Sequence, residues 1–269
     1  MTSGRHDHDY WADLDSMRVR YRRAGTGPPL LLLHGSGSSL EAFDRIAPPL
    51  HTDHDVIRPD LPGFGLTGPR PDRDYRITTY AAFLARLIDA LAVKTCSVAG
   101  HSLGGNIAWN LALDHPGRVD RLILMNATGY PGKTLPLAMR LARNPLTRPL
   151  LRRAGSRRAT AATLRSAAGS AFTVPDTLID RTHAMTGRPG NRQAFIDLAR
   201  TDQPDRTAHL SDITAPTLVL YGENIDGQHF ARDIPDSREA VLPGVGHLMP
   251  EEAPEAVTTA VRTFLEPLP

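Results

Sequence analysis

The chain has 269 residues, enough for one large α/β unit, and its net charge of +2 is too small to argue for nucleic acid or membrane binding. Its single cysteine, Cys96, excludes an intrachain disulfide and a cysteine-rich metal site, and we expect a buried structural thiol. The first 13 residues are polar and lack the apolar run of a signal peptide. The longest apolar run, at 30–33, is far shorter than the roughly 18 residues that a membrane span needs. Both observations favour a soluble cytoplasmic protein.

Short apolar runs alternate with helical patterns along most of the chain. Near the start, two antiparallel edge strands are expected at 10–14 and 17–25, the second because "MRVRY" alternates apolar and basic residues. Four continuous apolar runs indicate strands that are covered on both faces: 30–33, 98–99, 122–125 and 218–220. Three helical stripes accompany them: one from Thr79 capped by Thr78 or Thr79, one from 102 to about 114, and one over 253–265. This alternation predicts right-handed crossovers and a mostly parallel, doubly wound sheet.

The alternation stops between 130 and 209. This stretch has helical spacing and no strand candidate, which predicts a helical lid inserted between two sheet strands. Such an insertion would sit over the carboxyl ends of the strands, where open α/β sheets place their sites. The chain is thereby divided into a first core part at 1–129, a helical cap at 130–209 and a second core part at 210–269.

Charge is distributed unevenly between these parts. The segment 130–209 holds fourteen basic and five acidic residues, whereas the rest of the chain holds 17 basic and 24 acidic residues. A basic cap could attract an anionic substrate or an acidic carrier protein. The alternative is an ordinary solvated helical surface in a chain that uses Arg in place of Lys nearly everywhere.

The strongest chemical signal is "VAGHSLGGN" at 98–106. Gly100-His101-Ser102-Leu103-Gly104 fits the pattern Gly-x-Ser-x-Gly, directly after an apolar strand and directly before a helix. Glycines are needed there because the turn is tight and the serine backbone strained. This context favours Ser102 as a nucleophile over a serine that only caps a helix.

The chain resembles the α/β-hydrolase family, in its capped esterase, lactonase and epoxide-hydrolase-like branch. Besides "GHSLGG", the motifs that carry the resemblance are "LLLLHGSGSS", "DVIRPDLPGFGLT", "RLILMNATG", "ITAPTLVLYGE" and "LPGVGHLMPEEAPE". Their order implies the α/β-hydrolase fold for nearly the whole chain from Met17 onward. Such motifs are specific for fold and much less specific for substrate.

The resemblance also implies roles for particular residues. It places the backbone N–H groups of Ser36 and Leu103 in an oxyanion hole, where each could stabilise a tetrahedral intermediate by a few kcal/mol. His34 is then a structural turn residue. His247, in "PGVGHLMPEE", resembles the general base that takes the Ser102 proton.

The triad acid is harder to assign. The family pattern places a carboxylate at the position of Ile225, which is apolar. Asp226 is the only acid within one residue of that position, and the order Ser102, Asp226, His247 suits this fold. Three rivals stay open: Glu223 at a strand end, Asp233 in the next helix, and the neutral Asn126.

A serine nucleophile narrows the function. Family members that open epoxides or remove halides carry an aspartate at this position, so both activities are disfavoured. A serine there suits acyl transfer from an ester, lactone or thioester, or cleavage of a C–C bond. Because "GSGSS" lacks the ending of a phosphate-binding loop and no metal motif occurs, we expect neither cofactor nor metal. The alternative is a small-molecule binding protein or a non-hydrolytic cyclase or lyase on the same fold.

Overall fold

One eight-stranded sheet organises the molecule, for which the computed structural model describes residues 8–131, 137–148, 155–223 and 227–266. The strand order is β1-β2-β4-β3-β5-β6-β7-β8. The pairs β1–β2 and β2–β4 are antiparallel, and all the other neighbouring pairs are parallel. The strands are β1 Asp9–Leu14, β2 Met17–Ala24, β3 Pro29–Leu33, β4 Asp55–Pro59, β5 Cys96–His101, β6 Val119–Met125, β7 Thr217–Gly222 and β8 Ser237–Leu242. The mostly parallel, doubly wound sheet expected from the sequence is confirmed.

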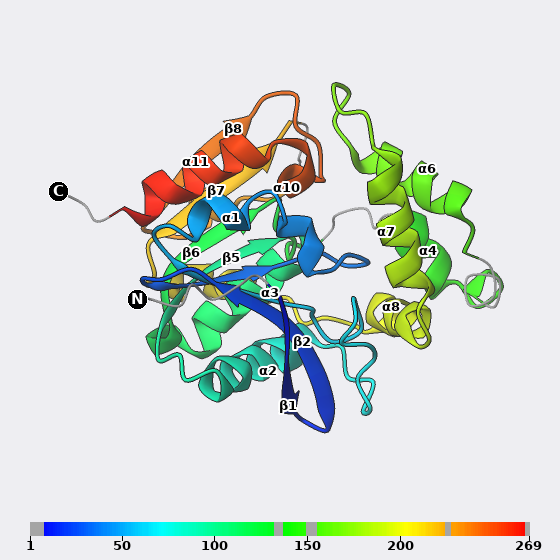
Figure 1. Ribbon diagram of the computed structural model, residues 1–269, viewed down its shortest axis with the longest axis horizontal. Helices are drawn as coiled ribbons and strands as arrows, with labels where there is room; N and C mark the ends of the chain where they lie inside the picture. Colours follow the sequence, from blue (N-terminus) through cyan, green and yellow to red (C-terminus); the bar gives the residue numbers. More distant parts are fainter. Residues whose placement is uncertain (1–7, 132–136, 149–154, 224–226, 267–269) are drawn as a thin grey trace.

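Helices cover both faces of this sheet, which explains its continuous apolar runs. Leu31 and Leu33 of β3 pack into the larger core, with α2 (Ile77–Ala90) and α3 (Leu103–Asp114). Leu30 and Leu32 point to the opposite face and pack with the helices α1 (Ala47–Leu50), α10 (Met249–Glu252) and α11 (Pro254–Leu265). Figure 1 shows α1 and α11 on one side of the sheet and α2 on the other. Short elements complete the core: η1 Leu40–Phe43, η2 Pro116–Arg118, η3 Thr207–Asp212 and α9 Phe230–Asp233.

A separate group of helices lies between β6 and β7 in the chain. It consists of α4 (Leu137–Arg143), α6 (Arg157–Ala167), α7 (Asp176–Gly187) and α8 (Asn191–Arg200), and Figure 1 shows it to the right of the sheet. Within the described ranges this insertion contains helices and no strand. It has small apolar clusters of its own, one of which packs against Leu248 after β8. We call these four elements the insertion helices.

Two local predictions were wrong. β2 is not an edge strand, since it pairs with both β1 and β4, and its Arg20 is buried among carboxylates. Neither Thr78 nor Thr79 caps α2, which begins at Ile77, two residues before Thr79. Asp74, in the loop before α2, instead bonds the start of the helix: its carboxylate accepts hydrogen bonds from the Arg76 N–H and the Thr79 hydroxyl.

Cys96 is buried in β5, as expected, and burial raises the pKa of its thiol to about 12. This favours a structural thiol over a reactive one. No helix in the described ranges has the length and apolar character needed to cross a membrane.

Candidate active site

Ser102 stands at a sharp turn between β5 and α3. Its backbone angles, φ 54° and ψ −113°, lie in a region that residues with a Cβ rarely adopt. Ser102 occupies the N-cap position of α3, but its side chain makes no capping hydrogen bond. Helix capping therefore does not explain the serine.

Close backbone approach explains the two glycines at either side of this turn. A Cβ on Gly100 would lie 2.3 Å from the Gly104 carbonyl oxygen, and a Cβ on Gly104 would lie 2.1 Å from the Leu33 carbonyl oxygen. Any side chain at these positions would force apart the turn, the helix and the end of β3. The position of Ser102 at the wall of a cavity depends on this packing.

His247 faces the serine from the loop after β8. Its Nε2 lies 3.0 Å from Ser102 Oγ, although the two residues are 145 positions apart in the chain. At this distance the imidazole can accept the hydroxyl proton, as a general base must. The structure thus brings together the two residues that the sequence proposed as nucleophile and base.

Three polar side chains hold the loop that carries His247. The Asn126 amide donates to the Gly246 carbonyl at 2.9 Å, and the His101 Nε2–H donates to the His247 carbonyl at 2.6 Å. The Glu252 carboxylate accepts hydrogen bonds from two N–H groups of the loop, those of Gly246 at 2.7 Å and Leu248 at 2.8 Å. These bonds fix the backbone on both sides of the imidazole, which is how an active site keeps a base in position.

His101 is neutral in this arrangement. It lies between the two motif glycines, and burial together with the nearby His247 lowers the pKa of its imidazole to about 3. A neutral ring with its proton on Nε2 can donate to a carbonyl without placing a second positive charge beside His247. The only signal in the sequence for this role of His101 is its place inside the Gly-x-Ser-x-Gly motif.

Ser36 and Leu103 have backbone N–H groups suited to an oxyanion hole. Leu103 is the first residue of α3, and Ser36 lies in the turn after β3, where it lines the same cavity as Ser102. Neither N–H donates to a backbone acceptor within the described residues. One donor in a turn and one at a helix N-terminus are suited to stabilise developing negative charge.

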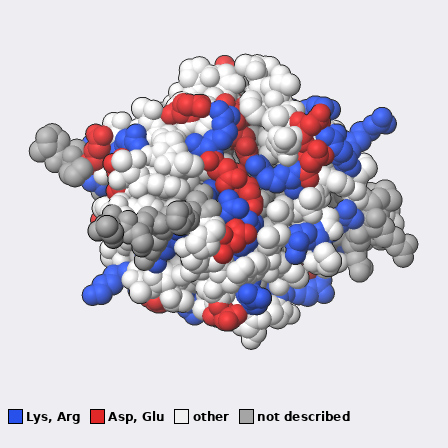
Figure 2. All heavy atoms as spheres, viewed as in Figure 1, with Lys and Arg blue, Asp and Glu red and all other residues white. Residues whose placement is uncertain are grey.

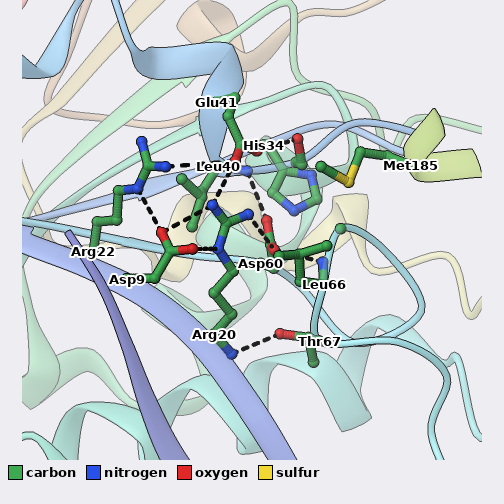
Figure 3. A network of polar contacts seen from close by, with 12 residues as sticks. Asp9, Arg20, Arg22, His34, Leu40, Glu41, Asp60, Leu66, Thr67 and Met185 are labelled. Atoms are coloured by element: carbon green, nitrogen blue, oxygen red, sulfur yellow. Dashed lines mark hydrogen bonds and ion pairs between the residues drawn. The ribbon is translucent and has the colours of Figure 1, made fainter. Parts of the chain in front are cut away.

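A buried ionic network lies behind this turn (Figure 3). Arg20 of β2 bonds Glu41 at 2.6 Å and Asp60 at 3.2 Å, and all three side chains are largely shielded from solvent. The Asp60 carboxylate also accepts hydrogen bonds from the backbone N–H groups of Leu40 at 2.8 Å and Leu66 at 2.7 Å. The network therefore fixes the C-terminal end of the segment 34–41, which contains Ser36.

His34 fixes the near end of the same segment. The residue is fully buried, and burial lowers the pKa of its imidazole. Its Nε2 accepts a hydrogen bond from the Leu61 N–H at 3.0 Å. This contact agrees with the structural role that the sequence suggested for His34.

The four candidates for the triad acid differ in their surroundings. Asp226 lies outside the described residues. Glu223 is exposed at the end of β7, and Asp233 ends α9, where its carboxylate accepts a hydrogen bond from the Tyr130 hydroxyl at 2.6 Å and pairs with Arg232. Asn126 uses its amide for the histidine loop and accepts a hydrogen bond from the Gly222 N–H at 2.8 Å.

Ser102 and His247 line a cavity of about 370 Å³. On the sheet side its walls include the turn at 35–38 and Phe64. The insertion helices supply most of the remaining wall, with small, apolar and hydroxyl side chains: Ala138, Met139, Ala159, Thr160, Thr163, Leu164, Leu178, Thr182, Met185, Thr186, Phe195 and Ile196. The size and lining suit a medium-sized, partly apolar molecule.

The basic character of the insertion is partly neutralised within the structure. Arg157 bonds both Asp176 and Asp180, and Arg143 bonds Asp202. Figure 2 shows acidic and basic side chains interspersed over the visible face. Within the described ranges, no group of three or more His, Cys, Asp or Glu side chains is arranged to hold a metal ion.

Comparisons with known proteins define the family. Residues 28–254 match the alpha/beta hydrolase fold family. A thermophilic esterase from Thermogutta terrifontis superposes with a TM-score of 0.80 at 27% identity, covering 96% of this chain and 98% of the esterase. The chain therefore belongs to the α/β-hydrolase family, as its motifs implied.

Two curated relatives illustrate the range of this family. An uncharacterized protein from Mycobacterium tuberculosis is 36% identical over 149 residues, which is 51% of this chain and 43% of that protein. The chain thus spans less than half the length of this relative. A 2-hydroxy-6-oxo-2,4-heptadienoate hydrolase from Pseudomonas putida is 29% identical over 215 residues, covering 74% of this chain and 73% of the enzyme.

Proposed function

We propose that the protein is a cofactor-independent serine hydrolase that cleaves an ester, lactone or thioester through an acyl-enzyme. One observation carries the proposal: a serine hydroxyl on a strained turn lies 3.0 Å from a histidine Nε2, and both residues line one cavity. This is the geometry of an activated nucleophile and its base. The similar structure from Thermogutta terrifontis is that of an esterase, and ester hydrolysis is one of the activities proposed here.

The proposed mechanism has two halves. His247 Nε2 takes the Ser102 proton as Oγ attacks the substrate carbonyl, and the N–H groups of Ser36 and Leu103 bind the resulting oxyanion. The tetrahedral intermediate collapses as the histidine returns the proton to the leaving group. In the second half His247 activates a water molecule, which releases the acid product and restores the serine. Asp226 would orient His247 and stabilise its positive form.

The insertion helices would act as a cap over this reaction. Their side chains form much of the cavity wall, so they would exclude water and select the acyl and leaving groups. The same basic helices are the surface on which we would expect an acidic carrier protein, if the acyl group arrives as a carrier-bound thioester.

Labelling with a fluorophosphonate tests the nucleophile. Wild-type protein should be labelled at Ser102, and Ser102→Ala should lose the label and at least about a thousandfold of the turnover of a short-chain ester, because no second nucleophile replaces the hydroxyl. Ser166→Ala, at an exposed position on α6, is the matched control and should be labelled like wild type. Undiminished turnover by Ser102→Ala would refute the serine mechanism.

Two further outcomes identify the alternatives. Turnover of a 2-hydroxy-6-oxo-dienoate but of no ester, lactone or thioester would favour C–C bond hydrolysis, the reaction type of the Pseudomonas putida relative. Labelling of Ser102 without turnover of any of these compounds would favour a binding protein, or a cyclase or lyase on the same fold.

A further inference from the structure

The charged groups of the cavity are not balanced. Besides the two histidines, its described lining contains one carboxylate, Glu251, and one guanidinium, Arg192. Glu251 is already neutralised, because it forms an ion pair with Arg181 of α7. Arg192 is half-buried and, within the described part of the chain, its side chain makes neither an ion pair nor a hydrogen bond. The cavity therefore carries one uncompensated positive charge.

The position of Arg192 is fixed by its surroundings. It is the second residue of α8, and the preceding Asn191 is buried and donates from its amide to the carbonyl oxygens of Gly65 at 3.0 Å and Met185 at 2.9 Å. A Cβ on Gly155 would lie 2.9 Å from Arg192 Nη2 and 3.0 Å from its Cζ. The guanidinium thus packs directly against Gly155, which has no side chain to displace it.

An ordinary surface role does not account for this arrangement. Arg157 and Arg143 of the same insertion reach aspartates at 2.5 and 3.2 Å, whereas α8 has no acidic residue in its first turn that could pair with Arg192. Partly removing a cation from water without a counter-ion is costly, and the N-terminus of a helix is an unfavourable place for positive charge. Both costs fall when an anion binds.

We propose that Arg192 binds a carboxylate of the substrate, remote from the bond that Ser102 attacks. The substrate would then be a half-ester, or another acyl compound with a free carboxylate joined to the reacting carbonyl by a short aliphatic spacer. The planar guanidinium offers paired donors that match the two oxygens of a carboxylate. Leu164, Phe195 and Ile196, which line the same cavity, provide apolar contact for the spacer. This proposal rests on the proposed serine hydrolase function.

Matched esters test the assignment by kinetics. The probes are p-nitrophenyl monoesters of C4 to C8 dicarboxylic acids, each compared with its counterpart whose far carboxylate is a methyl ester. Wild type should prefer the free carboxylate by about 10- to 100-fold in kcat/KM at its best spacer length, which is the usual value of a charge-assisted hydrogen bond. Most of this preference should lie in KM, since the contact is remote from the reacting atoms.

Variants of α8 separate this role from general surface charge. Arg192→Gln should lower kcat/KM for the carboxylate ester about tenfold more than for its methyl ester, and Arg192→Lys should keep part of the preference. Arg200→Gln, at an exposed position at the end of the same helix, should keep the wild-type preference. Equal losses on both probes, or a preference that survives Arg192→Gln, would overturn the assignment.

Binding to the Ser102→Ala variant keeps this test independent of turnover. Titration calorimetry should show tighter binding of the half-ester than of its methyl ester, and Arg192→Gln in the same background should remove the difference. If that preference is present but wild type hydrolyses neither probe, the hydrolase proposal fails and the carboxylate site stands. If binding shows no preference for the carboxylate, the assignment of Arg192 is wrong.

Discussion

Asn126, His101 and Glu252 show how much of the site lies outside the reacting pair. Each bonds a backbone atom at or next to His247, and none of these bonds reaches Ser102 Oγ. Their signals in the sequence are weak: Asn126 stands out only as a neutral rival for the triad acid, and Glu252 is one of two adjacent glutamates. Their partners are main-chain atoms of distant loops, which periodicity and motif spacing do not reveal.

The triad acid is the residue-scale question that mutation can settle. We expect Asp226→Asn to lower kcat by about a hundredfold or more, because converting a triad carboxylate to its amide has cost roughly 10⁴ in rate in a serine protease. Steady-state kinetics on an active ester measures this, and the thermal midpoint should stay almost unchanged.

Asp233→Asn is the matched control for this experiment. Its carboxylate is engaged by Tyr130 and Arg232, so its replacement should have little effect on kcat. Near-full activity of Asp226→Asn would mean that the acid lies elsewhere or that Ser102 and His247 work as a dyad, and the non-hydrolytic alternative would gain support.

At the scale of elements, the sequence was most informative where burial is uniform. The four continuous apolar runs all became strands covered on both faces, since such a run cannot place one face in solvent. It was least informative where charge is buried. The alternating "MRVRY" favoured an edge strand, yet the strand is internal and Arg20 is only 2% exposed, because Asp60, 40 positions away, and Glu41 pair with it.

The network around Arg20 should stabilise β2, the segment at 34–41 and the loop at 60–66 together. Arg20→Met would leave the buried Asp60 carboxylate without this cation and Glu41 with the longer pair to Arg22 at 3.7 Å, and breaking a buried ion pair costs about 3–5 kcal/mol in proteins. We therefore expect a fall of that size in the free energy of unfolding, measured in urea. Arg238→Met, at an exposed position on β8, should stay within about 0.5 kcal/mol of wild type. Equal stability of the two variants would show that the network contributes little.

The whole molecule combines a fold that the motifs predicted well with charges that they predicted poorly. The family and the mostly parallel sheet follow from local patterns, because strand, turn and helix signals each depend on neighbouring residues. The uneven charge of the segment 130–209 was visible in the sequence, but its consequences depend on which arginines find carboxylates. Arg157 does and Arg192 does not, and only the fold decides between them.

Buried neutral histidines should make the stability of the whole molecule depend on pH. The pKa of His101 is lowered from 6.5 to about 3, chiefly by burial, so between these values the unfolded chain binds a proton that the folded chain does not. Stability must therefore fall as pH falls through this window. For His101 alone, the linkage relation gives a loss of about 2 kcal/mol between pH 7.5 and pH 5.

His101→Gln isolates this contribution, since an amide can still donate to the His247 carbonyl but does not titrate. We expect the loss of unfolding free energy between pH 7.5 and pH 5 to be smaller in His101→Gln than in wild type by about 2 kcal/mol, as measured by urea unfolding at each pH. The comparison cancels other groups that titrate nearby, among them Asp60 and Glu251, whose pKa values burial raises. His209→Gln, which replaces an exposed histidine, should follow the wild-type slope. Identical slopes in all three proteins would mean that His101 takes up its proton in the folded state, and the histidine loop would then have to be held in another way.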